Sequence, residues 1–160
     1  MNEKSQFVSA DVVLGKDVYL GVCINLYGCS IGDETKIGAF VEVQRDVSIG
    51  ARCKISSHSF ICSGVIIEDN VFIGHGVMFT NDMHPRATKA DGSLEEAADW
   101  ADRMQKTRVC KGATIGSNAV IGCGLIIGAG STVGMGAVVT KDVPSGVTVV
   151  GNPARVLGNS

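Results

Sequence analysis

An apolar residue recurs every six positions along most of this chain. These positions are Val8, Leu14, Leu20, Leu26, Ile31, Ile37, Val43, Ile49, Ile55, Ile61, Ile67, Ile73 and Phe79, then Val109, Ile115, Ile121, Ile127, Val133 and Val139. Glycine follows the apolar residue in ten of these nineteen units. A period of six fits neither an amphipathic helix nor a series of hairpins, whereas it fits short strands joined by corners that tolerate glycine. The pattern therefore predicts a β-helix.

Three six-residue units complete one triangular coil, so residues about 18 apart stack at strand spacing, about 4.8 Å. The expected fold is all-β, with the geometry of a left-handed parallel β-helix. Leu26 and Ile31 are only five positions apart, which predicts one short corner. The repeat covers most of the chain, so we expect one domain over residues 1–160, stabilised by contacts between neighbouring coils.

One long interruption separates Phe79 from Val109 and predicts an inserted loop over about residues 80–108. Loops of this length on a compact scaffold are more often functional than accidental. Ser93 and Glu96 have the spacing of a capping box, which predicts a short helix after them. Beyond Val139 the repeat fades, and the tail is expected to form a short C-terminal cap over the last coil.

The composition limits the classes of binding partner and the cell compartment to be expected. The net charge of −2 and the eight aromatic residues give no general attraction to nucleic acid, so none is expected as a partner. The polar N-terminus and the lack of a long apolar run predict neither a signal peptide nor a membrane span. The six cysteines include no Cys-x-x-Cys pair, which favours small core fillers in a reducing cytoplasm.

The three histidines are the first candidates for chemistry. His75 is the third residue of its unit, at an outward corner, and one coil earlier the same column holds Ser57 with His58 beside it. We therefore expect two imidazoles within a few ångströms of each other. Histidine suits proton transfer near neutral pH, so His75 is the predicted base and His58 a candidate for orienting it. Solvated corner histidines with no function remain the alternative.

A polar cluster opens the inserted loop. It contains Asn81, Asp82, His84 and Arg86. The cluster suits recognition of a polar, hydroxyl-rich substrate, in which Asp82 could hold an ammonium group and Arg86 a phosphate or carboxylate. Turn formation before Pro85 is the structural alternative.

The motifs also resemble a known family. The six-residue array with Gly151-Asn152-Pro153-Ala154-Arg155 near its end resembles the hexapeptide-repeat acyltransferases. Within these, the segments 57–62, 74–77 and 79–86 resemble the N-acetyltransferases of nucleotide-linked 3-amino sugars. The resemblance implies a homotrimer with active sites between subunits and acetyl-CoA as the donor. It also implies a UDP- or dTDP-linked amino sugar as the acceptor, used in surface polysaccharide or lipopolysaccharide synthesis.

Acetyl transfer to an amine assigns further roles. A neutral amine must attack the thioester, and a backbone N–H must meet the resulting oxyanion, for which Ser117 is the candidate. Small corner residues, among them Asn118, Gly124 and Gly136, would leave room for the pantetheine arm of CoA along the axis. The cations expected to hold the CoA phosphates are Lys111, Lys141 and Arg155.

Three alternatives remain in view. The first is O-acetylation of a sugar or small alcohol on the same fold. The second is a zinc enzyme resembling the γ-class carbonic anhydrases, which needs three nitrogen ligands. Asn70 and Thr80, five positions from His75, do not supply the histidine pair of that family, so no metal is expected. The third is a structural or ice-binding solenoid, whose regular face the polar insertion would interrupt.

Overall fold

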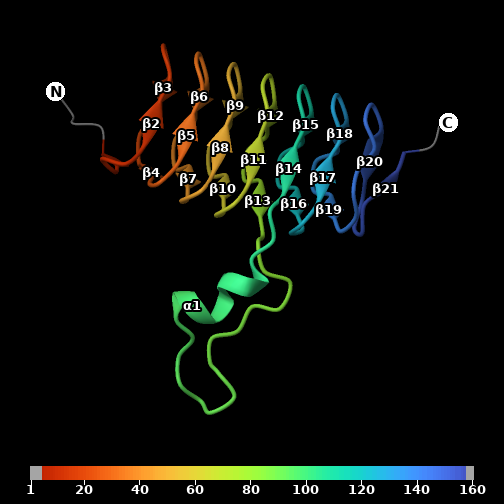
Figure 1. Cartoon of the computed structure of the whole chain (residues 1–160). Coiled ribbons are helices and arrows are strands. Elements are labelled where there is room, and N and C mark those ends of the chain that lie inside the picture. Colours follow the sequence, from red (N-terminus) through yellow and green to blue (C-terminus); the bar gives the residue numbers. More distant parts are fainter. Residues whose placement is uncertain (1–4, 158–160) are drawn as a thin grey trace.

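The chain winds into a solenoid of stacked triangular coils in the computed structural model, which describes residues 5–157 (Figure 1). Sheet A contains β1 (Gln6–Val8), β4 (Ile24–Leu26), β7 (Glu42–Val43), β10 (Phe60–Ile61), β13 (Met78–Phe79), β16 (Val120–Ile121) and β19 (Val138–Val139). Sheet B contains β2 (Val13–Leu14), β5 (Ser30–Ile31), β8 (Ser48–Ile49), β11 (Ile66–Ile67), β14 (Arg108–Val109) and β17 (Ile126–Ile127). Sheet C contains β3 (Tyr19–Leu20), β6 (Lys36–Ile37), β9 (Lys54–Ile55), β12 (Phe72–Ile73), β15 (Thr114–Ile115), β18 (Thr132–Val133), β20 (Thr148–Val150) and β21 (Arg155–Val156).

The strand register confirms the solenoid that the repeat predicts. Ile37 pairs with Ile55, one full coil of 18 positions away, in a parallel ladder. Leu14 pairs with Ile31, 17 positions away, because that coil contains the short corner. Phe79 pairs with Ile121 across the insertion. This parallel β-solenoid is consistent with the left-handed β-helix expected from the sequence.

The repeated apolar side chains form one continuous core along the axis. From Leu26 onward they are buried, as for Ile61 and Ile121. The first coil differs, because Val8 and Leu14 are 38% and 40% exposed where no earlier coil covers them. Contacts between coils therefore supply the burial, as expected for a solenoid.

Three rows of corners connect the sheets, and we name each after the sheets that it joins. Corner B–C follows sheet B, corner C–A follows sheet C and corner A–B follows sheet A. The turn at corner C–A needs a left-handed residue, which is His58 (φ 63°), Gly76 (φ 64°) and Asn118 (φ 58°) in successive coils. Glycine adopts this conformation without steric cost, which explains its frequency at the corners.

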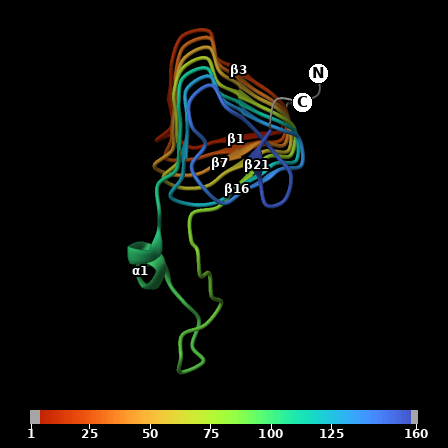
Figure 2. The ribbon, with the colours of Figure 1, turned by 90° about the vertical axis from the view of Figure 1, so that its right-hand side faces the viewer.

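The insertion leaves and re-enters the solenoid at corner A–B and projects away from it (Figure 2). It spans residues 80–107 and contains α1 (Ala97–Trp100) and the 3₁₀ turn η1 (Ala101–Arg103). The predicted cap is wrong by three residues, because the Glu96 N–H donates to Asp99 Oδ2 at 2.8 Å. Ser93 instead donates to Asp91 within a tight turn.

The C-terminal tail turns back on the last coil. Strand β21 pairs antiparallel with β20 at the end of sheet C, with Val149 opposite Val156. The predicted cap thus lies at this end of sheet C. In residues 5–157, no helix is long and apolar enough to cross a bilayer. All six cysteines are free thiols, and burial raises the pKa of Cys62 to about 12.

Candidate active site at two corners of the solenoid

His75 lies on a fixed piece of backbone at corner C–A. Its Nδ1 is 2.9 Å from Ser57 Oγ, one coil earlier. Its backbone N–H donates to Ser117 Oγ at 3.2 Å, and its carbonyl accepts from the Asn118 N–H at 2.7 Å, one coil later. The exposed imidazole is therefore held from both neighbouring coils, and it sits on a rigid element that can fix a catalytic group.

Gly74 makes this close stacking possible. A Cβ at position 74 would lie 2.5 Å from the backbone nitrogen of Ser117. The next coil therefore approaches the chain more closely than any side chain would allow. In the described residues the Ser117 N–H has no hydrogen-bond partner, and it lies beside Gly74, the residue before His75. That this N–H donates to the oxyanion stays a prediction, which the lack of another partner for it supports.

The closeness of the two imidazoles stays a prediction, whereas the side-chain contact to His75 is made by Ser57. His58 occupies the left-handed position of its corner and stacks on Phe40 one coil earlier, with ring centroids 4.8 Å apart. If His75 accepts a proton at Nε2, its Nδ1–H must donate to Ser57 Oγ. Ser57 is therefore an orienting residue that we missed, and its position 18 residues before His75 was the available signal.

Arg103 joins the first and second parts of the insertion through hydrogen bonds to two carboxylates. Its Nε donates to Asp82 Oδ2 at 3.0 Å, and its Nη2 donates to Glu95 Oε2 at 2.6 Å. Asp82 Oδ1 also accepts from the His84 N–H at 2.7 Å. The His84 N–H and the Arg103 guanidinium lower the pKa of Asp82, so its carboxylate stays ionised. Asp82 is thus paired within the insertion and helps to order the loop, and its contact with a substrate ammonium group stays a prediction.

A cavity of about 270 Å³ lies beside this ion cluster. It is lined by Gln44, Asn81, Asp82, Pro85, Arg86, Glu95, Trp100 and Arg103. Three of the four predicted acceptor residues are thus brought together, while exposed His84 is not among the lining residues. The Asn81 side chain donates to the Ser63 carbonyl at 3.3 Å, which joins the loop to the solenoid.

His75 and the insertion lie at opposite ends of strand β13 in one chain. His75 precedes the strand at corner C–A, whereas the insertion follows it at corner A–B. Figure 2 shows the insertion projecting from a single corner of the triangle. Six residues along the chain traverse one side of a coil, so closeness in sequence does not place the insertion beside His75. One copy of the chain therefore does not unite the two halves of the predicted site.

The predicted CoA residues are likewise divided among corners. Asn118 and Gly136 share corner C–A with His75, whereas Gly124 lies at corner A–B under the Gln105 side chain. Lys111 lies at corner B–C, where its backbone N–H donates to Glu68. Within one chain these positions do not line one edge, because only residues one full coil apart share an edge.

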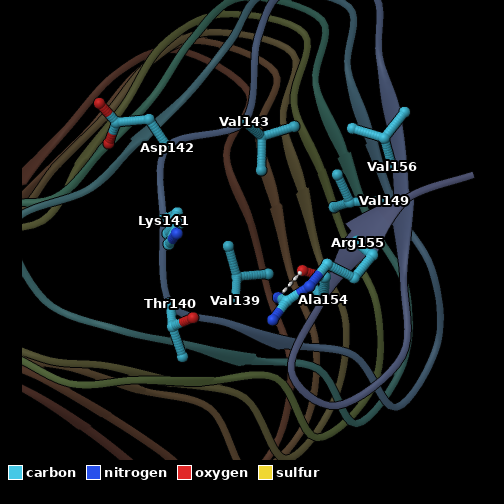
Figure 3. Close-up of a pocket in the computed structure, with 9 residues that line it drawn as sticks. All are labelled: Val139, Thr140, Lys141, Asp142, Val143, Val149, Ala154, Arg155 and Val156. Carbon is cyan, nitrogen blue, oxygen red and sulfur yellow. Dashed lines mark hydrogen bonds between the residues drawn. The ribbon is translucent and has the colours of Figure 1, made fainter.

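Lys141 and Arg155, in contrast, meet at the C-terminal end of the solenoid. They line opposite sides of a cavity of about 230 Å³ (Figure 3). The apolar side chains of Val139, Val143 and Val149 form the inner wall of this cavity. The Arg155 side chain is exposed and, within residues 5–157, donates only to the neighbouring Ala154 carbonyl, at 2.8 Å. Two cations at one open cavity suit a phosphate-bearing ligand.

The ion cluster predicts that acid releases the insertion before the solenoid unfolds. The folded-state pKa of Asp82 lies below its ordinary 3.8, so its stabilising effect is complete above about pH 5 and is lost as the pH falls through the lowered value. Trp100, the single tryptophan, should change its fluorescence in this range while the β signal in circular dichroism persists. Asp82→Asn should shift the fluorescence already at pH 7. Simultaneous loss of both signals would contradict this account.

The described part of the chain, residues 5–157, contains no group of three or more His, Cys, Asp or Glu side chains that could hold a metal ion. His75 instead contacts serine and backbone groups.

Two segments match family models of the repeat, one on each side of the insertion. Residues 28–63 match the bacterial transferase hexapeptide (six repeats), and residues 107–141 match the hexapeptide repeat of succinyl-transferase. The bifunctional protein GlmU of Aquifex aeolicus is 33% identical over 123 residues, which are 77% of this chain and 22% of that protein. The chain therefore spans less than a quarter of the length of this curated relative.

Solved structures share the solenoid. The hexapeptide-repeat acetyltransferase VCA0836 of Vibrio cholerae, solved with acetyl-CoA, is 25% identical with a TM-score of 0.66, over 82% of this chain and 70% of that one. A mutant of AntD, an N-acyltransferase of Bacillus cereus solved with dTDP and CoA, has a TM-score of 0.76 over 91% of this chain and 82% of its own. AntD is only 20% identical, which shows a common fold. The matched segments and the stacked six-residue coils show that this chain is built on the hexapeptide repeat of the bacterial transferases.

Proposed function

We propose that the protein is an acetyltransferase that moves an acetyl group from acetyl-CoA to the amine of a nucleotide-linked amino sugar. The observation that carries this proposal is His75, held by Ser57 at a rigid corner beside the unpaired Ser117 N–H. VCA0836 is described with acetyl-CoA, and AntD with dTDP and CoA, which are ligands of the proposed classes. The family resemblance of the sequence extends the role to surface polysaccharide synthesis, including lipopolysaccharide, in the cytoplasm.

The proposed reaction uses these groups in sequence. The sugar amine attacks the thioester carbonyl, a C–N bond forms, and the amine proton passes to His75 Nε2. The Ser117 N–H stabilises the oxyanion. The oxyanion then collapses, the C–S bond breaks, and the CoA thiolate takes the proton from His75. Ser57 keeps the imidazole in the tautomer that this sequence needs.

A homotrimer would complete the site. The outer face of sheet A carries a column of paired apolar residues, Phe60, Met78, Val120 and Val138. Met78 is 43% exposed in the single chain, and exposed apolar columns of this kind mark interfaces. In a ring of three copies with sheet A facing the axis, corner C–A of one copy meets corner A–B of the next. His75 would then face the insertion of the neighbouring subunit.

The donor would lie on the C-terminal side of His75. Asn118 and Gly136 continue its corner in that direction, and Gly124 would join from corner A–B of the neighbouring subunit. Lys141 and Arg155 would hold the CoA phosphates at the C-terminal cavity. Lys111 lies at corner B–C, away from the donor in this arrangement, so we propose no role for it in CoA binding.

The decisive experiment is a panel of UDP- and dTDP-linked amino sugars assayed for CoA release. Matched sugars with a hydroxyl in place of the amine serve as controls. Release with amino sugars alone is expected, whereas release with the hydroxyl sugars would indicate an O-acetyltransferase. Release with neither would refute the proposed acceptor class.

Sedimentation should give three times the 16.6 kDa chain mass, and a single-chain mass at micromolar concentration would refute the trimer.

A further inference from the structure

A third cavity borders His75 on the side away from Ser117. It has a volume of about 250 Å³ and opens on the outer face of sheet C. Its polar lining residues are Tyr19, Lys36, Lys54, Ser56, Ser57 and His75. No lining residue is acidic, so the cavity has a positive electrostatic character beside the predicted base.

The two lysines of this cavity are direct neighbours. Lys36 and Lys54 are register partners on the adjacent parallel strands β6 and β9. Such strands are about 4.8 Å apart, and like charges at directly opposed positions repel each other. Neither lysine forms an ion pair in the described residues, although the Lys54 Nζ lies 5.7 Å from the Phe72 ring centroid. The pair is unfavourable alone and would be stabilised by an anion that both ammonium groups contact.

Ser56 provides an independent observation in the same cavity. Its side chain is buried, with a residue exposure of 4%, and among residues 5–157 its Oγ has no hydrogen-bond partner. A buried hydroxyl without a partner costs free energy, so each such case in a native protein calls for an explanation. A ligand oxygen in the cavity would supply the missing acceptor.

The residues of the cavity follow one another along the solenoid axis. Tyr19, Lys36 and Lys54 lie on three successive coils of sheet C, and His75 follows the strand of the fourth coil. The total rise from the coil of Tyr19 to the coil of His75 is about 14 Å at ordinary strand spacing. An extended nucleotide-linked sugar can span this length, with its diphosphate in the middle.

We propose that the cavity of Lys36, Lys54 and Ser56 binds the diphosphate of the nucleotide-linked acceptor. This inference rests on the proposed function and places the acceptor on the N-terminal side of His75, with the donor on the C-terminal side. The two ammonium groups and the Ser56 hydroxyl contact the phosphate oxygens. The sugar amine then reaches His75, and the nucleoside extends toward the Tyr19 ring, which lines the far end of the cavity.

Calorimetric titration with UDP, dTDP and CoA tests this assignment. The variants are Lys36→Gln, Lys54→Gln and Ser56→Ala, and the matched control is Lys16→Gln, an exposed lysine at corner B–C. Each lysine variant should weaken nucleoside diphosphate binding on the order of tenfold and leave CoA binding unchanged, without lowering the melting temperature, because it also removes the repulsion between the two lysines. Ser56→Ala should weaken nucleotide binding without lowering the melting temperature, because it removes an unpartnered hydroxyl. The control should match the wild type.

Two results would overturn the assignment while leaving the proposed function intact. These are unchanged nucleotide affinity in both lysine variants, or a loss of CoA affinity in place of nucleotide affinity. A wild-type protein that binds CoA but no nucleoside diphosphate, with GDP and ADP included in the panel, would overturn both this site and the proposed acceptor class. The unaffected CoA binding distinguishes that failure from the others.

Discussion

His75→Ala is expected to lower kcat by about 10²–10⁴-fold at pH 7, the range of a positioned general base. The backbone of His75 is hydrogen-bonded to the next coil, and one ring nitrogen contacts Ser57 in the previous coil. Loss of the side chain therefore removes the proton acceptor without disturbing the coil. The increase of rate with pH should also flatten, because the imidazole that accepts the amine proton is gone. Initial rates of CoA release from pH 6 to 9 measure both effects.

Two further variants separate His75 from its neighbours. His84→Ala should retain most of the wild-type kcat, since its side chain is exposed and does not line the cavity of the insertion. Ser57→Ala should lower kcat less than His75→Ala and shift the pH profile, because it frees the imidazole to change tautomer. If His84→Ala loses activity while His75→Ala keeps it, the assignment of the base is wrong. If both keep it, the substrate amine arrives neutral and no side chain acts as base.

The fold was predictable because one repeated contact generates it. Each unit places an apolar side chain such as Ile37 or Ile55 in the core, and the period alone fixes three short strands per coil. The five-residue step from Leu26 to Ile31 predicted the 17-residue coil, and the gap after Phe79 predicted the insertion. Stacking at 18-residue spacing also predicted that Ser57, His75 and Ser117 share one column.

The rest of the site was harder to predict for two physical reasons. Neighbouring units lie on different corners, so residues close in sequence, such as His75 and Asn81, separate to opposite ends of a strand. The insertion has no repeat, and its order depends on Arg103, whose contacts with Asp82 and Glu95 follow no periodic spacing. Lys36 and Lys54, in contrast, were detectable as two cations one coil apart, on the column that leads to the corner of His75.

Mixed trimers of two inactive variants are expected to recover activity. His75→Ala removes the base at corner C–A, and Asp82→Ala releases the Arg103 cluster at corner A–B. Each variant alone should be nearly inactive. We expect each site to join His75 of one subunit to the insertion of the next. Such a site is intact when the first subunit is an Asp82→Ala chain, which keeps His75, and the next is a His75→Ala chain, which keeps the insertion. Random mixing of equal amounts makes about a quarter of all sites intact in a heterologous ring, which is about one site in three once only mixed trimers are kept.

Co-expression of the two variants with different affinity tags, followed by purification through both tags, isolates the mixed trimers for the CoA-release assay. The control mixes His75→Ala with His75→Asn, which cannot produce an intact site and should stay inactive. Recovery only in the first mixture requires that the two corners act across a subunit boundary. No recovery there, with confirmed mixed trimers, would place the functional insertion and His75 in separate sites. In that case only groups of the subunit that carries His75, among them the Lys36 and Lys54 cavity, would hold the acceptor.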